Sequence, residues 1–254
     1  MLNFSNYIII ALASLAAGAV NSIAGGGTLI TFPVLTALGI PAVSANITNT
    51  VALCPGYLGG SLSQGKDLQN QKKRLWLYIP ASIVGGLLGG ILLRITPEGL
   101  FRELVPYLIL LATALLVFQP IVRSYLTKRT ETVGAQPRSD LWGVVPVGIA
   151  AIYGGYFGAG LSIIVLAVLG ITVDDSLTQL NALKQTIALG TNLTAGLFFV
   201  FSGKVVWSVA LVMAIGALLG GALGGKLAGH VKPAVLRWMV VVIGLIVATL
   251  YFIR

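Results

Sequence analysis

The stretch YGGYFGAGLSIIVLAVLGI, residues 153–171, joins a cluster of glycines to an apolar segment that is too short to cross a membrane. The apolar part, 159–171, has thirteen residues, whereas a transmembrane helix needs about 20. A stretch of the same design, NSIAGGGTLITFPVLTALGI, fills residues 21–40. Short apolar segments at matching places in the two halves of a chain indicate an internal repeat.

Composition places the chain among membrane proteins. Of its 254 residues, 57% are hydrophobic and only 9% are charged, and the mean hydropathy is +0.96. A soluble domain of this length needs far more polar surface, so we expect an all-α polytopic membrane protein. The single cysteine excludes a disulfide framework and a cysteine metal cluster, and we expect no cofactor.

Apolar runs divide the chain into two sets of five segments. The first set covers about 4–23, 28–40, 44–64, 75–95 and 104–122, and the second covers about 141–155, 159–171, 177–202, 205–226 and 233–252. We therefore expect one transmembrane domain over 1–254, made of repeat 1 at about 4–122, a linker at about 123–140 and repeat 2 at about 141–252.

Paired motifs support this repeat. GGLLGGILL at 85–93 matches GALLGGALG at 216–224, and FPVLTALGI ending at Ile40 matches IVLAVLGI ending at Ile171. Five segments per copy is an odd number, so we expect two inverted-topology repeats whose short broken helices meet near the bilayer midplane. The sequence leaves open whether 28–40 and 159–171 cross fully or enter the membrane and return.

Basic residues predict the orientation. If the chain crosses the membrane ten times, eleven lysine and arginine residues lie on one side and four on the other. If the short segments are re-entrant, ten of these residues lie on one side and five on the other. The eleven are Lys66, Lys72, Lys73, Arg74, Arg123, Lys128, Arg129, Arg138, Lys226, Lys232 and Arg237, and the four are Arg94, Arg102, Lys204 and Arg254. The positive-inside bias then places the linker in the cytoplasm and both termini outside the inner membrane. The same bias accounts for the net charge of +9 without a nucleic-acid partner.

Lys184 is the only charge in the apolar run 177–202. On a helix, Asn181, Lys184 and Gln185 share one face, and Asn192 lies two turns beyond on roughly that face. Lysines near helix ends can extend to the membrane interface, but this one lies several residues into the run. We therefore expect Lys184 to line a central site.

The corresponding segment of the first half is SANITNT, residues 44–50. It contributes the amides of Asn46 and Asn49 and the hydroxyl of Thr50. Aligning the GK dipeptides at the segment ends places Lys184 opposite Asn46, and one small gap places it opposite Thr50. Either alignment brings the lysine among polar groups of the other repeat.

The two glycine clusters supply backbone N–H groups at the start of a helix, where the positive end of the helix dipole suits an anion. Each cluster could also be a site of close helix packing, but their pairing across the repeat favours a substrate site. The candidate substrate-binding residues are Lys184, Asn49, Thr50, Asn46, Asn192, Asn181, Gln185, Gly26, Gly27, Thr28, Gly158 and Gly160.

The acidic residues indicate the charge of the ligand. All seven fall in connections or at segment ends: Asp67, Glu98, Glu103, Glu131, Asp140, Asp174 and Asp175. None is placed to neutralise Lys184 inside the membrane, so a visiting anion would pair with it. A small oxyanion such as a sulfonate, sulfite or carboxylate fits these groups.

These motifs resemble the TauE/SafE family of sulfite and organosulfonate exporters over nearly the whole chain. The resemblance rests on AGGGTLITFPVLTALGIP with ANITNT in the first half, and on GAGLSIIVLAVLGI with LNALKQTIALGTNLTA in the second. Many members carry a lysine straight after the first Thr-Asn step, where this chain has Thr50. The resemblance implies a transporter that exports sulfite or organosulfonates such as sulfoacetate by alternating access of its two halves.

Other functions are weaker expectations. An anion channel or a proton-coupled uptake permease for sulfonates or carboxylates is the alternative. The chain lacks His-Glu-x-x-His and Gly-x-Ser-x-Gly, and its single histidine, His230, lies in a basic connection, so we expect no enzyme. Its expected partners are the small anion, the lipid bilayer and a further copy of itself in a homo-oligomer.

Overall fold

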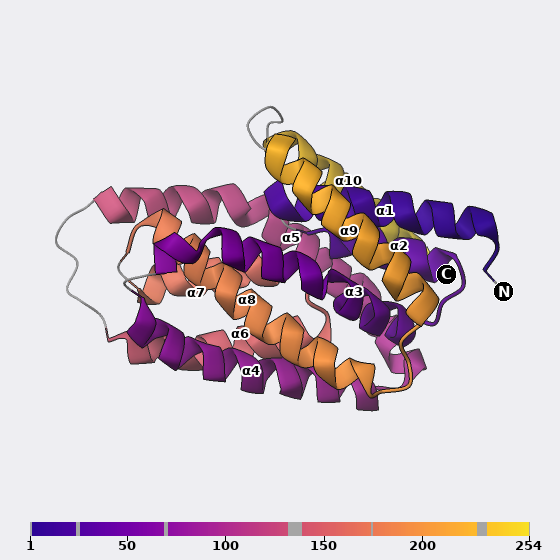
Figure 1. The fold of residues 1–254 in the computed structure, drawn as a ribbon, viewed down its shortest axis with the longest axis horizontal. Helices are drawn as coiled ribbons and strands as arrows, with labels where there is room; N and C mark the ends of the chain where they lie inside the picture. Colours follow the sequence, from indigo (N-terminus) through magenta and orange to yellow (C-terminus); the bar gives the residue numbers. More distant parts are fainter. Residues whose placement is uncertain are drawn as a thin grey trace.

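A computed structural model describes residues 2–23, 26–68, 71–131, 139–173, 175–227 and 233–253. Every regular element in these ranges is helical (Figure 1). The elements are α1 (Phe4–Ile23), α2 (Thr28–Ala37), α3 (Ala42–Ser63), η1 (Gly65–Leu68), α4 (Lys72–Ile95), α5 (Glu98–Glu131), η2 (Asp140–Gly143), α6 (Val144–Tyr156), α7 (Leu161–Thr172), α8 (Leu177–Val200), α9 (Trp207–Leu227) and α10 (Pro233–Ile253). The ten α-helices match the ten predicted segments, and the predicted all-α fold is confirmed.

The surface of the bundle is apolar. Four helices, α1, α4, α5 and α10, are long and apolar enough to cross a membrane. Many large hydrophobic side chains on α4, α5, α9 and α10 are exposed in the isolated chain. In a soluble protein such a surface would cause aggregation, whereas lipid covers it in a bilayer. The predicted polytopic membrane protein is therefore confirmed.

Helices α6 and α7 form a short hairpin. They have 13 and 12 residues, or about 20 and 18 Å, so neither spans a bilayer alone. Arg74 holds both ends of the hairpin: its Nε lies 3.1 Å from Asp140 before α6, and its Nη1 pairs with Asp175 after α7. Segment 159–171 therefore enters the molecule and returns to the end where Arg74 lies, which we call the basic face.

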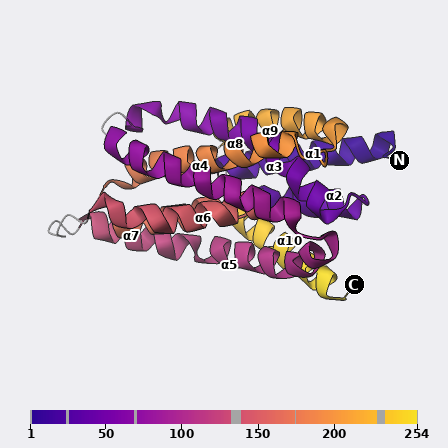
Figure 2. The ribbon, with the colours of Figure 1, turned by 90° about the horizontal axis from the view of Figure 1, so that it is seen from below.

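Helix α2 returns to the opposite end. It has only ten residues, and Thr36 near its end accepts a hydrogen bond of 2.8 Å from Tyr251 in the last turn of α10. Both chain termini lie at this end, which we call the terminal face (Figure 1). Figure 2 shows α2 toward this end and α6 with α7 toward the other. The two hairpins, α1–α2 and α6–α7, thus enter from opposite ends.

The helices pack in matching pairs. Extensive contacts join α1 to α9, α3 to α9, α4 to α6 and α4 to α8. If the chain is a repeat of five helices, α1 corresponds to α6, α3 to α8 and α4 to α9. The contact of α1 with α9 then corresponds to that of α6 with α4, and the contact of α3 with α9 corresponds to that of α8 with α4. This correspondence supports the predicted repeat, whose inverted sense stays a prediction.

Helices α4 and α9 each pack mainly on the half of the sequence to which they do not belong. Helix α4 packs on α6 and α8 of the second half, and α9 packs on α1 and α3 of the first. We call α1, α2, α3, α9 and α10 the first packing unit, and α4 to α8 the second packing unit. The main contacts between the units are α3 with α8 and α5 with α10.

Glycines make this packing sterically possible. A Cβ on Gly85 would lie 2.5 Å from the carbonyl oxygen of Gly148 in α6, and one on Gly220 would overlap the backbone of Leu15 in α1. The GGLLGG and GALLGG motifs therefore bring backbones together, as small residues do in membrane helices.

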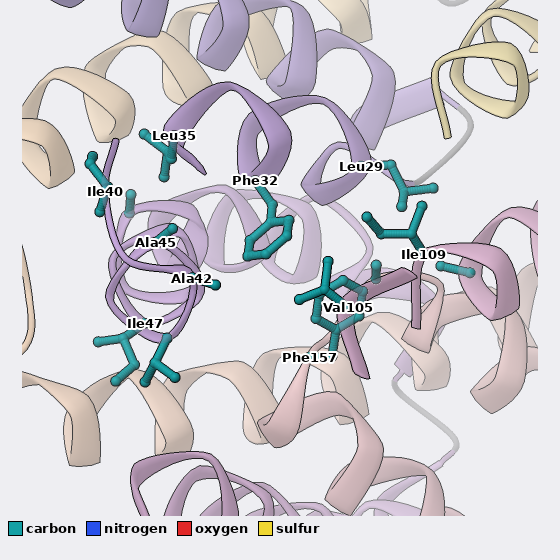
Figure 3. Close-up of a cluster of buried hydrophobic side chains, with 14 of the residues drawn as sticks. Leu29, Phe32, Leu35, Ile40, Ala42, Ala45, Ile47, Val105, Ile109 and Phe157 are labelled. Carbon is teal, nitrogen blue, oxygen red and sulfur yellow. The ribbon is translucent and has the colours of Figure 1, made fainter. Parts of the chain in front are cut away.

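The two hairpins meet in an aromatic cluster. Phe32 of α2 packs edge-on against Phe157, with ring centroids 5.5 Å apart, and against Phe101 of α5 at 6.4 Å. All three side chains are buried. Figure 3 shows Phe32 and Phe157 in the same cluster as Val105 and Ile109 of α5. This packing fixes the position of one hairpin relative to the other.

One predicted boundary differs. Helix α5 continues to Glu131, past the predicted end at 122, so the linker predicted at 123–140 begins inside a helix. Lysine and arginine are good helix formers, and the polar end of α5 needs no apolar surroundings to stay helical. Residues 132–138 of the predicted linker, and Gly25, lie outside the described residues.

Candidate substrate site at two glycine turns

The first turn, Gly26–Gly27, joins α1 to α2. Gly26 has a φ of 93°, a left-handed conformation that favours glycine. The N–H of Gly27 donates to Oδ1 of Asn21 over 2.8 Å, so one of the backbone groups expected to face a ligand already has a protein partner. Gly27 is the N-cap residue of α2 and has no side chain of its own to cap the helix, while the N–H of Leu29 donates to the carbonyl oxygen of Gly26 over 2.9 Å. The positive end of the helix dipole lies at this turn.

Asn49 of α3 binds the first turn of α2. Its Oδ1 accepts a hydrogen bond of 2.5 Å from Thr31, and its Nδ2 donates to Oγ1 of Thr28 over 3.3 Å. All three residues are buried. Thr28 and Asn49 were predicted for the site and lie together. Thr31 was not predicted, although its spacing of three from Thr28 places both on one helix face.

The second turn, Phe157–Gly160, joins α6 to α7. Gly158 and Gly160 each have a φ of 80°. The hydroxyl of Tyr153 donates to the carbonyl oxygen of Ala159 over 2.6 Å and ties the turn to α6. Gly160 is the N-cap residue of α7 and has no side chain to cap it, while the N–H groups of Leu161 and Ile163 donate to the carbonyl oxygens of Gly158 and Gly160.

Asn46 and Asn192 flank the second turn. Asn46 of α3 donates from Nδ2 to the carbonyl oxygen of Tyr156 over 2.8 Å. Asn192 of α8 donates to the carbonyl oxygen of Ala188 over 2.8 Å, and its Oδ1 lies 3.9 Å from the position a Cβ on Gly158 would take. Four predicted residues, Asn46, Asn192, Gly158 and Gly160, therefore lie close together.

Helix α3 connects the two turns. Asn46 and Asn49 are three residues apart on one face, and they contact the second and the first turn respectively. Thr50 donates to the backbone carbonyl of Asn46 in its own helix over 3.0 Å. The first half of α3 thus carries polar side chains to both glycine turns.

Lys184 lies nearer the basic face. It is eight residues before Asn192, or about 12 Å along α8. Its Nζ donates to Oδ1 of Asn181 over 3.0 Å, and Arg123 of α5 acts on it as a like charge. Gln185 follows it and is partly buried. Lys184, Asn181 and Gln185 thus form a third group, which lies along α8 between its start at the basic face and Asn192.

The family model described as "Sulfite exporter TauE/SafE" matches residues 10–251. The chain belongs to the TauE/SafE family. The family predicted from the glycine turns and the Thr-Asn steps is confirmed.

Curated relatives of this family member are named as probable membrane transporters. It is similar to a "Probable membrane transporter protein" of Haemophilus influenzae, with 26% identity over 79% of this chain and 76% of the relative. It is 25% identical to the "Probable membrane transporter protein YfcA" of Escherichia coli (strain K12), over 81% of this chain and 74% of that protein. It is 27% identical to the "Probable membrane transporter protein ORF9" of Sinorhizobium sp, over 82% of this chain and 77% of that protein.

No solved structure gives a significant match. The family and these relatives show that the TauE/SafE chain is a multi-pass membrane transporter and not an enzyme. Its function therefore requires a site that takes a small molecule from one end of the molecule and releases it at the other.

Proposed function

We propose that this transporter exports a small sulfur-containing anion, sulfite or an organosulfonate such as sulfoacetate, across the cytoplasmic membrane. The observation that supports an anion most directly is the pair of helix starts at glycine turns, where the N-cap residue is a glycine, beside Asn49 and Asn192. Helix starts stabilise oxyanions through their N–H groups and dipoles, and the amides and hydroxyls add hydrogen bonds. The name of the family model agrees with a sulfur oxyanion.

Lys184 supplies positive charge on the way to the site. In the described residues both ion pairs are made by Arg74, which takes Asp140 and Asp175. Lys184 instead contacts the neutral amide of Asn181, and its charge is available to an entering anion. With the basic face in the cytoplasm, Lys184 and Arg123 would draw anions from that side.

Membrane potential favours export. A monoanion that leaves an inside-negative cell gains roughly 2.3 kcal/mol per 100 mV. Export therefore needs no coupling ion, which agrees with the placement of the acidic residues outside the apolar segments. Alternating access follows if the first and second packing units rock about the two turns, because α3 and α8 meet there.

Binding and flux test the proposal. Calorimetry on the purified protein would give saturable binding of sulfite or sulfoacetate, weakened tenfold or more in Lys184→Ala. Lys204→Ala, on the terminal face, is the matched control and should bind as the wild type does. In proteoliposomes the flux should follow the membrane potential.

Three results would contradict parts of this proposal. Equal binding by Lys184→Ala and wild type would remove the lysine from the anion path. Flux that ignores the potential and requires a proton gradient would establish the proton-coupled permease. Unitary currents far above transporter turnover would establish the channel.

A further inference from the structure

The amide of Asn46 is buried with one of its polar atoms unused. The side chain has 0% exposure. Its Nδ2 donates to the carbonyl oxygen of Tyr156 over 2.8 Å, which fixes the orientation of the amide, since a flipped amide would set two oxygens against each other. Its Oδ1 is buried and has no hydrogen-bond partner among the described residues. A buried acceptor left unpaired is unfavourable, so a ligand that supplies a donor would be stabilised there.

Other oxygens lie beside the same turn. A Cβ on Gly158 would be 3.1 Å from the carbonyl oxygen of Gly154 and 3.9 Å from Oδ1 of Asn192. The Nδ2 of Asn192 is turned away to Ala188 in its own helix. The side chains from α3 and α8 therefore present hydrogen-bond acceptors to the second turn.

The turn at Gly26–Gly27 is flanked by hydrogen-bond donors instead of acceptors. Oγ1 of Thr28 accepts from Asn49, its hydroxyl hydrogen has no acceptor among the described residues, and Nδ2 of Asn49 has a second hydrogen. These donors suit the oxygens of an anion. Because Asn46 and Asn49 are separated by about 4.5 Å along α3, one compact ligand can reach both turns.

We propose that the transported anion carries a hydrogen-bond donor, an O–H or N–H group, which Asn46 Oδ1 accepts at the second turn while the anionic group binds the first. This inference rests on the proposed function and narrows its substrate class. A protonated oxyacid monoanion and a hydroxysulfonate have the required chemistry, and an aminosulfonate carries the donor as a zwitterion without net charge. A sulfonate without a donor leaves the oxygen of Asn46 unpaired.

A series of two-carbon sulfonates tests, on the wild-type protein alone, whether the ligand needs a hydrogen-bond donor. Ethanesulfonate has no hydrogen-bond donor, and 2-hydroxyethanesulfonate adds an O–H group at the same net charge. 2-Aminoethanesulfonate adds N–H groups on an ammonium ion, which cancels the charge of the sulfonate at neutral pH. We expect at least one donor-bearing ligand to bind the wild-type protein tenfold or more tightly than ethanesulfonate in calorimetry. Whichever donor-bearing sulfonate binds more tightly shows whether the site prefers an O–H or an N–H donor.

The variant Asn46→Leu tests whether Asn46 is the acceptor that causes this preference. The preference for the donor-bearing ligand should vanish in this variant, while ethanesulfonate keeps its affinity within a few-fold. Thr113→Val, which removes another buried hydroxyl without a hydrogen-bond partner among the described residues, on α5 and outside the candidate site, should retain the preference. If Asn46→Leu does not fold, Asn46→Ser provides the same comparison with a smaller change in the core.

The outcomes separate the two proposals. If ethanesulfonate binds as tightly as both donor-bearing ligands, the inference about Asn46 is wrong and anion transport still stands. If none of the three sulfonates and no sulfite binds, the proposed function fails as well. A preference that persists in Asn46→Leu would place the acceptor elsewhere and overturn the assignment.

Discussion

At the scale of single residues, the site depends on backbone positions that only glycine occupies without strain. Gly158 combines a φ of 80° with a place between Asn192 and the end of α6. A side chain there would be strained by the backbone conformation and would reach into the space where a ligand would contact the second turn.

We predict that Gly158→Ala lowers the free energy of unfolding by about 1–2 kcal/mol and weakens anion binding. The added Cβ would lie 3.1 Å from the carbonyl oxygen of Gly154. Gly148→Ala is the control, because a Cβ at that helical position has nothing within 4 Å. Thermal unfolding in detergent measures both; equal melting temperatures for the two variants would contradict the strain argument.

Asn49 is the other residue on which the site depends. Asn49→Leu would leave the hydroxyls of Thr31 and Thr28 without their buried partner, at a cost of about 1–3 kcal/mol. Thr31→Val removes one of these bonds with little change in shape, and we expect a smaller loss. Sulfite binding should weaken more in Asn49→Leu than in Thr31→Val, as calorimetry would show; the reverse order would argue against a role for the Asn49 amide.

At the scale of elements, short helices need support that their own sequence does not give. A bare hairpin of α6 and α7 would leave polar ends in the membrane. Arg74 holds both ends at the basic face, Gln71 donates to the carbonyl oxygen of Gln179 in the first turn of α8 over 2.9 Å, and Tyr78 donates to the carbonyl oxygen of Asp140 over 2.8 Å. The start of α4 thus fixes the hairpin and the helix after it.

We expect Arg74→Gln to loosen both ends of the α6–α7 hairpin together. The ion pairs are partly exposed, so the loss of stability should be about 1 kcal/mol. Hydrogen exchange should speed up near Asp140 and near Asp175, and high salt should reproduce part of the effect. Arg94→Gln, near the exposed end of the same helix, should leave both regions unchanged. Faster exchange at one end alone would show that Arg74 does not hold both.

Adjacent glycines on α9 provide a sharper test of helix packing. Gly220→Ala would push a methyl group into the backbone of Leu15 and should destabilise the protein by about 1–3 kcal/mol. Gly221→Ala meets only Gly18 at 3.9 Å, so we expect no loss, or a gain of up to about 1 kcal/mol from helix propensity. Melting temperatures of the pair measure the difference. Similar destabilisation by both would contradict the packing of α9 on α1.

At the scale of the whole molecule, the packing units cut across the halves of the sequence. The second packing unit is the continuous stretch from α4 to α8, while the first combines α1 to α3 with α9 and α10. Motion between the units should therefore occur along the contacts of α3 with α8 and of α5 with α10. Close glycine contacts should keep α9 with α1 throughout the cycle.

Disulfide crosslinking in a Cys54→Ala background tests this division. Ser61 of α3 and Thr186 of α8 have hydroxyl oxygens 3.3 Å apart, so cysteines there would join the units. Oxidation of this pair should stop anion flux reversibly. Cysteines at Ser82 of α4 and Gly190 of α8, whose Cβ atoms would lie 3.6 Å apart, would join two helices of one unit and should leave flux intact. Loss of flux in the second pair alone would contradict the division.

Much of the architecture could be predicted because it depends on local properties of the chain. Apolar run lengths reflect the cost of exposing backbone groups to lipid, and they identified the ten helices and the short elements α2 and α7. Glycine clusters mark turns for steric reasons, and they identified both turns of the candidate site. Apolar run lengths did not predict the long polar end of α5, because helix formation does not require apolar residues.

The tertiary structure decided what depends on distant contacts. Hydropathy cannot show that α4 packs with the second half and α9 with the first, since both choices bury similar glycine faces. It cannot show that Asn46 bonds to the end of α6 whereas Asn49 bonds to the start of α2. Nor can it show that the N–H of Gly27 donates to Asn21, or that Lys184 lies about two helical turns from Asn192. A sequence pattern specifies which face of a helix is polar or small, whereas the partner of that face is set by shape complementarity among all ten helices.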